Sequence, residues 1–255
     1  MEAYGKEDEE NENMISVCMA TYNGEQFIKE QIDSILPQLG DEDELVVSDD
    51  GSRDATLSML QAYDDSRIRI LINEGKHGFV WNFENALRSA KGDVIFLCDQ
   101  DDYWFPNKVE VALKELGDCD LLVHDAEIVD GEGKPRGCSY YETNHRRTDF
   151  LSNFWKSRFI GCCMVFRRSV LQASLPFPKT TVGHDYWIGM YASSRFKVKF
   201  IPDKLMAYRR HGRNASPSSE KSNTTLYFKF VKKRFPLLFS VIGRRLKDIT
   251  HSSSC

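Results

Sequence analysis

The sequence predicts an α/β protein with a Rossmann-like, mostly parallel sheet flanked by helices. Short apolar runs alternate with amphipathic segments through the first hundred residues, which is the pattern of successive strand–helix–strand units. Short polar segments (TYN, DDGS and DQDD) follow three of the apolar runs. In such sheets ligands bind beyond the carboxyl ends of the strands, so we expect these segments to meet at one ligand-binding edge. With 255 residues, 41% of them hydrophobic, the chain can bury a full core.

The first half of the chain is expected to alternate strictly between strands and helices. Its strands are expected at residues 14–20, 45–47, 68–72 and 94–98. The helices between them, recognised by apolar residues at helical spacing, are expected within residues 25–39, 55–63 and 80–90. The second half is less regular, and its expected elements are a strand at 121–124, a hairpin at 127–137, an apolar segment at 161–166, a helix at 183–192 and a strand at 197–201.

The two ends of the chain differ in charge. Residues 1–13 carry six acids against one lysine, which predicts a disordered acidic tail before a domain of residues 14–216. Residues 217–255 are expected to form a linker and a basic helical extension, in which residues 226–249 carry seven bases against one acid. This amphipathic segment, interrupted by Pro236, either lies on an anionic membrane surface or packs back on the domain.

Several features favour a reduced, cytoplasmic protein. The sequence lacks the run of about 18 apolar residues that a transmembrane helix needs. Its N-terminus does not have the basic-then-apolar order of a signal peptide. The seven cysteines are odd in number and include no CxxC pair, so a zinc site is not expected. If the basic segment binds lipid, the protein lies peripherally at the inner face of the cell membrane.

An acidic cluster of Asp99, Asp101 and Asp102 follows the fourth expected strand directly, with no basic residue within five positions. One explanation is that Asp102 caps a helix beginning near Phe105 and Pro106. A calcium loop is a second, but the ligand spacing and central glycine of such loops are missing. A third is a Mg²⁺ or Mn²⁺ ion that holds a substrate diphosphate and neutralises the cluster. The place of the cluster at the end of a parallel strand favours this third explanation.

Five segments resemble the family 2 glycosyltransferases, which have the GT-A fold. These segments are TYNGEQFIKEQIDSI, VVSDDGSRDAT, NEGKHGFVWNFENAL, IFLCDQDDYWFPNKV and GHDYWIGM, and the match runs from Ile15 to Ser216. DQDDYW and YRRHGRNAS are most similar to bacterial rhamnosyltransferase-like members that build surface polysaccharides. The resemblance implies an inverting, metal-dependent transfer of a sugar, with rhamnose as one candidate, from a nucleotide-diphosphate donor to a hydroxyl of a cell-surface glycan. A lipid-linked glycan is one form of that acceptor.

The resemblance also assigns roles to residues in these segments. Nucleotide contacts are implied for Thr21, Tyr22, Asn23, Asp49, Asp50 and Asp99. Ligation of Mn²⁺ or Mg²⁺ is implied for Asp101, Asp102 and His211, although the register within the cluster stays open and Asp101 can replace Asp99 at the ribose. Diphosphate or acceptor contacts are implied for Arg209, Arg210, Arg213, His184 and Trp187.

Asp185 is the candidate catalytic base. Inverting transfer needs a group opposite the leaving diphosphate that takes the proton of the attacking hydroxyl, and a carboxylate within hydrogen-bond reach suffices. Asp185 in GHDYW stands where the family has its base, and its alternative role is to cap the following helix. Trp187 either stacks on the acceptor sugar or packs in the core. The three arginines around His211 either bind the diphosphate or form a solvated surface patch.

Two further points stay open. Many family members carry an arginine before the asparagine of the helix that feeds the acidic strand, whereas this sequence has Trp81 before Asn82. Lys76 or His77 is the candidate for the same task. The alternative to an enzyme is a non-catalytic subunit or sensor that binds a nucleotide sugar. In either case the expected partners are a nucleotide-diphosphate sugar and a glycan, and no nucleic acid.

Overall fold

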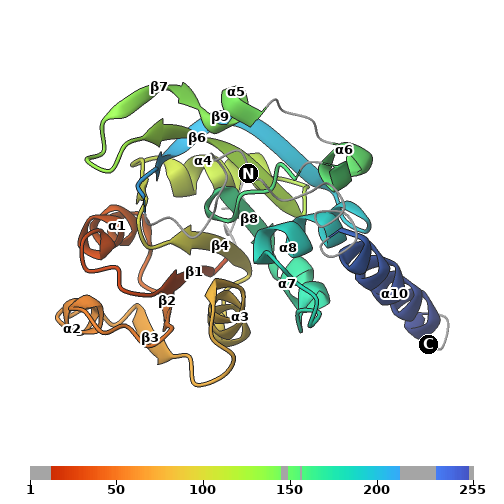
Figure 1. Cartoon of the computed structure of the whole chain (residues 1–255), viewed down its shortest axis with the longest axis horizontal. Coiled ribbons are helices and arrows are strands. Elements are labelled where there is room, and N and C mark those ends of the chain that lie inside the picture. Colours follow the sequence, from red (N-terminus) through yellow and green to blue (C-terminus); the bar gives the residue numbers. More distant parts are fainter. Residues whose placement is uncertain (1–12, 145–148, 156, 213–233, 253–255) are drawn as a thin grey trace, which may run out of the picture.

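The computed structural model describes residues 13–144, 149–155, 157–212 and 234–252. Within them the strands form one nine-stranded sheet in the order β3-β2-β1-β4-β8-β6-β9-β5, and β7 also pairs with β6. Figure 1 shows the helices arranged around this curled sheet. The predicted α/β fold with a mostly parallel sheet is confirmed.

The elements have the following bounds. The strands are β1 (Ile15–Thr21), β2 (Glu44–Asp49), β3 (Ile68–Ile72), β4 (Val94–Asp99), β5 (Tyr103–Trp104), β6 (Leu121–Val129), β7 (Pro135–Ser139), β8 (Met164–Arg167) and β9 (Val198–Arg209). The α-helices are α1 (Ile28–Ile35), α2 (Thr56–Gln61), α3 (Phe79–Ser89), α4 (Lys108–Leu116), α5 (Tyr140–Asn144), α6 (Phe150–Trp155), α7 (Arg168–Ser174), α8 (His184–Ser193) and α10 (Phe235–Ser252). Two 3-10 turns are η1 (Leu36–Gln38) and η2 (Gly161–Cys163).

The four strands of the first half lie side by side and are all parallel. β1 pairs with β2 on one side and β4 on the other, and β2 pairs with β3. The side chains of β1 and β4 are buried on both faces, which is why these strands appear in the sequence as continuous apolar runs. Because the four strands are parallel, their carboxyl ends lie at one edge of the sheet.

The second half completes the sheet with strands that are longer than predicted. β8 runs antiparallel between β4 and β6, and β9 runs parallel to β6. The strand expected at 197–201 continues to Arg209, because the residues after Lys204 are buried and pair with β6 and β5. This extension carries the basic segment after Tyr208 to the same edge of the sheet as the acidic cluster.

The acidic cluster forms a tight turn between β4 and β5. β5 pairs with β9, Tyr103 opposite Ala207 and Trp104 opposite Met206, so the chain turns back directly after Asp102. α4 begins only at Lys108, with Asn107 at its N-cap position. The explanation of Asp102 as a helix cap is therefore excluded.

α10 packs against α8 at the end of the molecule away from α1 and α2 (Figure 1). Leu237 and Val241 on its inner side are buried, and Pro236 lies in its first turn, where a missing N–H is tolerated. Residues 1–12, the linker at 217–223 and residues 226–233 lie outside the described part, so the predicted domain boundaries stay predictions. Among the helices described, none has both the length and the apolar content to cross a bilayer.

Candidate active site

The loops after β1, β2 and β3 are joined by backbone hydrogen bonds at the carboxyl edge of the sheet. The Asp50 N–H donates to the Thr21 carbonyl at 2.9 Å, and the Asn73 N–H donates to the Asp49 carbonyl at 2.8 Å. Asn82 of α3 adds a bond from its side-chain amide to the Thr21 carbonyl at 3.0 Å. The TYN and DDGS segments therefore meet at one edge, as the parallel sheet requires.

Thr21 and Asp49 lie beneath this edge. They are register partners in β1 and β2, so their side chains project from the same face and Thr21 Oγ1 donates to Asp49 Oδ2 at 2.9 Å. The N–H groups of Gly51 and Ser52 and the Ser52 hydroxyl also donate to the Asp49 carboxylate. Both side chains are buried and these bonds occupy both oxygens. The side chains of Thr21 and Asp49 are thus held by each other and by the DDGS turn, and their nucleotide contacts stay a prediction.

Tyr22 and Asn23 of the same segments are exposed, whereas the Asp50 side chain is 11% exposed and also accepts the Asn73 side-chain amide at 2.7 Å. The Tyr22 side chain is 53% exposed, and Asn23 is exposed on the same loop. Asp50 accepts the Gly78 N–H at 2.7 Å, and His77 Nδ1 lies 2.9 Å from its other carboxylate oxygen. These three residues therefore stay the candidates for nucleotide contacts on this side of the edge.

Lys76 and His77, the candidates for the missing arginine, have different surroundings. Lys76 Nζ lies 3.9 Å from the centre of the Trp81 ring, which is a cation–π contact. His77 instead bonds to Asp50 of the DDGS turn. The ammonium group of Lys76 therefore lies over the Trp81 ring, and it comes from the loop before α3.

Gln100, which no sequence pattern singled out, joins the acidic turn to the TYN loop. Its Oε1 accepts the Tyr22 N–H at 2.9 Å, and its Nε2 donates to the Tyr22 carbonyl at 3.1 Å. The contact requires a glycine nearby, because a Cβ on Gly24 would stand 2.3 Å from Gln100 Oε1. The one signal in the sequence was its place between Asp99 and Asp101.

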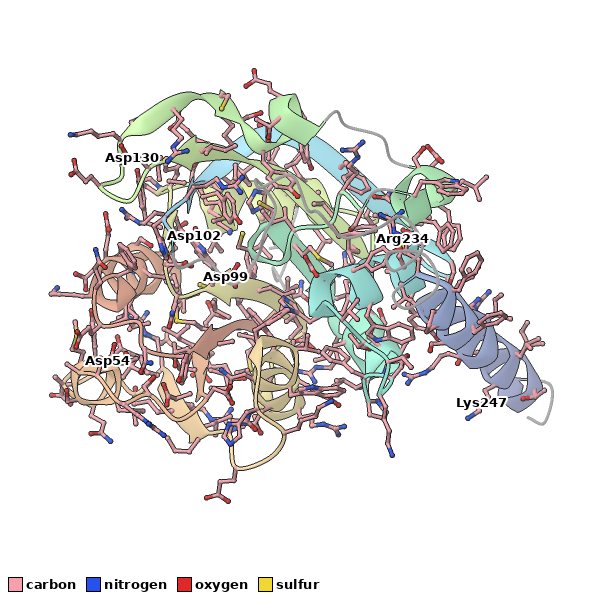
Figure 2. The ribbon with its side chains drawn as sticks, in the orientation of Figure 1. Asp54, Asp99, Asp102, Asp130, Arg234 and Lys247 are labelled. Carbon is pink, nitrogen blue, oxygen red and sulfur yellow. The ribbon has the colours of Figure 1, made fainter. Side chains whose placement is uncertain are left out.

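The three aspartates of the acidic cluster have different environments. Burial, together with the nearby charges of Asp101 and Asp185, raises the pKa of Asp99 to about 7. Asp101 Oδ2 lies 2.8 Å from His211 Nε2. Asp102 is fully buried, and its Oδ1 accepts the backbone N–H of Arg209 at 2.8 Å. Figure 2 shows Asp99 and Asp102 close together in the middle of the molecule, near the end of β4.

One group of possible metal ligands lies beside the turn. Asp99, Asp102 and Cys162 each place a ligand atom within 4.8 Å of the others. Burial and the neighbouring carboxylates raise the pKa of the Asp102 carboxyl well above its usual value. A bound cation would offset this repulsion and favour the ionised carboxylate, whereas the Cys162 thiol is a poor ligand for Mg²⁺ and Mn²⁺. The metal-ligand role implied for Asp102 therefore stays a prediction.

Asp101 and His211 form a second group, which fits a divalent ion better. A carboxylate suits Mg²⁺ and Mn²⁺, and an imidazole nitrogen is a common ligand of transition metals. The His211 ring stacks on Phe27 with ring centroids 4.8 Å apart, which fixes the plane of the imidazole. An ion held by Asp101 and His211 would lie beside Asp99, at the edge where the nucleotide is expected.

Arg209 holds the acidic turn in place and does not face a diphosphate. Its guanidinium donates to the carbonyls of Asp101 and Gly131 at 2.9 and 3.1 Å and pairs with Glu30 of α1. With a residue exposure of 2%, the side chain has no open surface to offer a ligand. The diphosphate contact implied for Arg209 is at odds with this arrangement, because the turn and α1 already take its donors.

Arg210 is the arginine of this segment that keeps an open guanidinium. The side chain is half-buried, and within the described residues its guanidinium lies against the Tyr208 ring at 5.8 Å. Arg213, the third arginine, lies outside the described residues. A diphosphate contact therefore stays a prediction for Arg210.

Asp185 opens α8 and lies near the acidic turn. Its Oδ1 accepts the Tyr186 N–H at 2.7 Å, and its charge contributes to the raised pKa of Asp99. Burial raises the pKa of Asp185 itself to about 6. A carboxyl group whose pKa lies this close to neutral pH is suited to take up and release a proton. The Gly161 N–H also donates to this carboxylate, which opposes the effect of burial on its pKa.

His184 and Trp187 face the core on either side of Asp185. His184 stacks on Phe83 with ring centroids 3.8 Å apart, and burial lowers its pKa to about 3. A neutral imidazole supplies no charge to a diphosphate. Trp187 is fully buried and donates its Nε1–H to the Ser174 carbonyl at 2.9 Å. The structure is at odds with ligand contacts by either residue, because α8 is covered on most sides.

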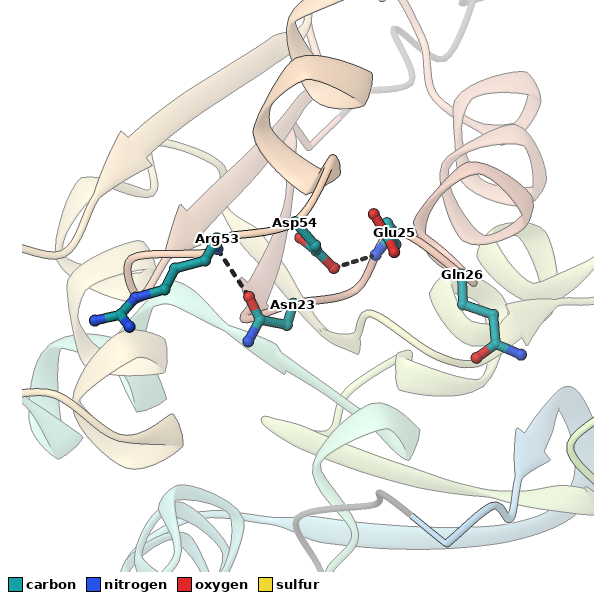
Figure 3. A pocket seen from close by; sticks show the side chains of 5 residues that line it. All are labelled: Asn23, Glu25, Gln26, Arg53 and Asp54. Carbon is teal, nitrogen blue, oxygen red and sulfur yellow. Dashed lines mark hydrogen bonds between the residues drawn. The ribbon is translucent and has the colours of Figure 1, made fainter.

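A hollow of about 610 Å³ lies beside the TYN loop. It is lined by polar side chains, namely Asn23, Glu25, Gln26, Arg53 and Asp54 (Figure 3). Two hydrogen bonds connect the residues of its wall. The Glu25 N–H donates to Asp54 Oδ2 at 3.1 Å, and the Arg53 N–H donates to Asn23 Oδ1 at 2.8 Å. The open surface at this edge is therefore polar and braced by backbone groups, which suits a polar ligand.

The fold and the site together define an α/β protein with a ligand-binding edge at which a proton can also be transferred. A mostly parallel sheet gathers the Asp101–His211 pair and the half-buried Asp185, whose pKa is raised, at its carboxyl edge. The sequence profile of the family described as Glycosyl transferase family 2 matches residues 16–175. The chain belongs to this family and is a glycosyltransferase.

Individual relatives and solved structures agree with this assignment. WfgD of Escherichia coli, a UDP-Glc:alpha-D-GlcNAc-diphosphoundecaprenol beta-1,3-glucosyltransferase, is 37% identical over 92% of this chain and 89% of its own length. The dTDP-rhamnosyl transferase RfbG of Shigella flexneri is 28% identical over 77% of this chain and 72% of its own. A structure of S. aureus TarS with UDP-GlcNAc matches with a TM-score of 0.64 at 22% identity. The match covers 79% of this chain and 60% of the TarS chain. The likeness to TarS shows the GT-A fold.

Proposed function

We propose that the protein is an inverting, metal-dependent glycosyltransferase that moves a sugar from a nucleotide diphosphate to a hydroxyl of a lipid-linked cell-surface glycan. The observation that carries the proposal is the place of Asp185, a half-buried carboxyl group close to Asp99 at the carboxyl edge of the sheet. It is a proton acceptor at the edge where a nucleotide sugar is expected to bind.

The chemistry follows from this placement. The acceptor hydroxyl attacks the anomeric carbon while Asp185 takes its proton, and the bond from that carbon to the diphosphate oxygen breaks on the opposite side. The new bond therefore has inverted configuration, and the nucleoside diphosphate leaves. Burial favours the neutral form of Asp185, so the carboxylate is a stronger proton acceptor than an exposed aspartate.

The donor side is built from the predicted nucleotide residues at this edge. Tyr22, Asn23 and Asp50 bind the nucleotide, and Asp99 contacts the ribose. Asp101 and His211 would hold the Mn²⁺ or Mg²⁺ ion, which supplies positive charge to the diphosphate as the bond breaks. The guanidinium of Arg210 adds a second positive charge near the diphosphate.

The named activities of the relatives support two donors. WfgD, at 37% identity, uses UDP-glucose and an acceptor linked to diphosphoundecaprenol. RfbG, at 28% identity, is named for dTDP-rhamnose. We infer UDP-glucose as the first candidate donor, dTDP-rhamnose as the second, and a lipid-diphosphate acceptor at the cytoplasmic face of the membrane.

The substitution Asp185→Asn tests the role of the base. Asparagine keeps the size of the side chain and the bond from the Tyr186 N–H but cannot take a proton, so transfer should fall by about 10²–10⁴-fold. Donor binding, measured by thermal shift, should change little. Asp118→Asn is the control, because that residue is exposed and pairs only with Lys197 on the surface. A wild-type protein that binds donor but transfers nothing would instead support the non-catalytic sensor.

The metal is tested with His211→Ala in a thermal-shift panel of UDP-, dTDP- and GDP-sugars. Wild type should be stabilised by one nucleotide class, and EDTA should remove most of that effect. The variant should lose the response to Mn²⁺ while the weaker, metal-free binding remains, because one of the two proposed ligands is gone. Equal stabilisation of the wild type with and without the ion would contradict a metal-dependent donor site.

A further inference from the structure

α10 has two apolar faces, of which one packs on α8 and the other is exposed. The inner face includes the buried Leu237 and Val241. The outer face carries Phe235, Phe239, Ile242, Leu246 and Ile249, with exposures of 44%, 68%, 45%, 59% and 53%. Their alternating spacing of four and three residues places all five in one stripe along the helix.

The stripe continues onto α6. Leu151 and Trp155 of α6 are 67% and 60% exposed. The two helices meet where the Phe154 and Phe235 rings lie 6.1 Å apart and Arg234 donates to the Trp155 carbonyl. We call the combined surface the α6–α10 ridge, defined by Leu151, Trp155, Phe235, Phe239, Ile242, Leu246 and Ile249.

Two basic residues flank the stripe on α10. They are Lys247, which Figure 2 shows near the far end of the helix, and Arg245, which also lies 3.9 Å from Asp248. Beside α6 the exposed Asp149 adds one acid. The acid of this helix, Asp248, turns away toward α8, where it accepts a hydrogen bond from the Tyr191 hydroxyl at 2.5 Å and pairs with Arg195 at 2.8 Å. An apolar stripe edged by basic residues is the pattern of a helix that lies in the plane of an anionic membrane.

We propose that the α6–α10 ridge docks the protein on an anionic lipid surface. The purpose of this docking rests on the proposed lipid-linked acceptor, whereas the ridge itself is a feature of the structure. A second copy of the chain fits the surface less well, because pairing two stripes would bring Arg245 and Lys247 of both copies together. An exposed tryptophan at the end of the ridge matches the preference of that residue for the membrane–water interface.

The docking surface is fixed relative to the candidate base. Arg244 and the inner face of α10 hold the helix on α7 and α8, and Asp185 lies in the first turn of α8. A lipid surface in contact with the ridge would therefore have a defined position relative to the site that receives the acceptor hydroxyl.

Vesicle flotation with the full chain tests the proposal. Wild type should bind vesicles that contain phosphatidylglycerol, bind less at high salt, and bind weakly to pure phosphatidylcholine. The double substitution Phe239→Gln with Leu246→Gln should weaken binding by at least about tenfold, since it removes two large apolar side chains. Ile72→Gln is the matched control, because Ile72 is 49% exposed on β3, outside the ridge, and should leave binding unchanged.

Tryptophan fluorescence gives a second readout of the same contact. Trp155 is far more exposed than the buried Trp104 and Trp187 and the half-buried Trp81, so vesicles should shift the emission of wild type to the blue. Trp155→Phe should lose most of that shift while flotation persists.

Three outcomes would overturn the proposed role of the ridge. The first is a wild type that does not bind vesicles, and the second is vesicle binding that the double substitution leaves unchanged. The third is a wild-type dimer that the double substitution turns into a monomer with no change in vesicle binding. Sugar transfer to an acceptor dissolved in detergent, in the absence of vesicles, separates the ridge from the proposed function. The rate should be equal in wild type and the double variant. Vesicle binding by a wild type that has no such transfer would refute the proposed function and leave the ridge intact.

Discussion

Asp185 and His184 are neighbours in the first turn of α8, and burial shifts their pKa values in opposite directions. It raises the pKa of Asp185 to about 6 and lowers that of His184 to about 3. In both residues burial disfavours the charged form. The two effects support each other, because a charged imidazole next to Asp185 would hold its pKa low. The neutral His184 is therefore part of what keeps Asp185 a strong proton acceptor.

The neutral state of His184 predicts a pH-dependent cost in stability. Its pKa is about 3 in the folded chain and 6.5 as its ordinary value, so the unfolded chain takes up the extra proton as the pH falls below 6.5. At pH 5 this should lower the free energy of unfolding by about 2 kcal/mol relative to pH 8. His184→Gln lacks this titration. The difference in free energy of unfolding between wild type and variant, measured with urea, should therefore change by that amount between pH 8 and pH 5.

Asp185 enters this experiment with the opposite sign. Its pKa is raised in the folded chain, so its contribution to stability falls as the pH rises toward 6. Because Asp185 is present in both proteins, this contribution cancels to first order in the comparison. A difference between wild type and His184→Gln that is the same at pH 8 and pH 5 would contradict a buried, neutral His184.

At the scale of elements, the candidate donor site depends on how the acidic turn meets the TYN loop. Gln100 makes both hydrogen bonds to the Tyr22 backbone, and Gly24 leaves the room for it. Asp99 and Asp101 are its neighbours in the chain. The amide of Gln100 therefore positions the acidic turn relative to the TYN loop, where the nucleotide is expected.

Gly24→Ala tests this coupling. The new Cβ would stand 2.3 Å from Gln100 Oε1 and push the amide away from Tyr22. We expect the KM for the nucleotide sugar to rise by about tenfold, the equivalent of one or two hydrogen bonds, with a smaller change in kcat. Kinetics of donor turnover at saturating Mn²⁺ provide the measurement.

A double-substitution cycle separates this effect from a general loss of stability. Gln100→Ala removes the group that the new Cβ would meet, so Gly24→Ala should cost little more in the Gln100→Ala background. Additive effects of the two substitutions would mean that Gly24 matters for the loop itself and that the contact with Gln100 does not.

The strands and helices of the first half could be predicted because each is encoded locally. β4 lies at Val94–Asp99, where its apolar run indicates a strand, and buried parallel strands have a recognisable composition. The orientation of site side chains could not be predicted in the same way. Thr21 and Asp49 turn toward each other because of the register between β1 and β2. That register is a contact between segments distant in sequence, which local patterns do not contain.

Arg209 shows the same limit for the second half of the site. Three arginines in a short segment indicated a cationic loop, but the length of β9 decides which of them is open. Because β9 continues to Arg209, that side chain lies inside the sheet edge against Glu30, and Arg210 is the next to emerge. Charge patterns thus located the segment, and the end of the strand assigned the individual residues.

For the whole molecule, α10 shows one of the two alternatives that the sequence left open for the C-terminal segment, and the membrane contact stays a proposal. α10 packs back on the domain through one face and presents a second apolar face to solvent. A charge count and an amphipathic pattern do not distinguish these cases, because both faces are apolar and Arg244 turns inward while Arg245 and Lys247 do not. The way in which α10 is held on the domain can therefore be tested with the arginines themselves.

Arg244 is the polar contact that attaches α10 to α7 and α8. Its guanidinium donates to the carbonyls of Ala173, Leu175 and Pro176 at 3.0, 2.9 and 2.6 Å. It also stands 5.3 Å from the centre of the Trp187 ring. These carbonyls lie in the last turn of α7 and just after it, where the helix supplies no N–H donors for them.

Arg244→Met keeps most of the side-chain stem but removes these donors, so it should lower the free energy of unfolding by about 2–4 kcal/mol. The matched control is Arg245→Met, whose partner Asp248 lies 3.9 Å away at the surface, and which should change stability by about 0.5 kcal/mol or less. Urea unfolding of the two variants makes the comparison. Donor binding should persist in both, because the contact is far from the acidic turn. If Arg244→Met lowered the free energy of unfolding as little as Arg245→Met does, the apolar side chains alone would hold the inner face of α10.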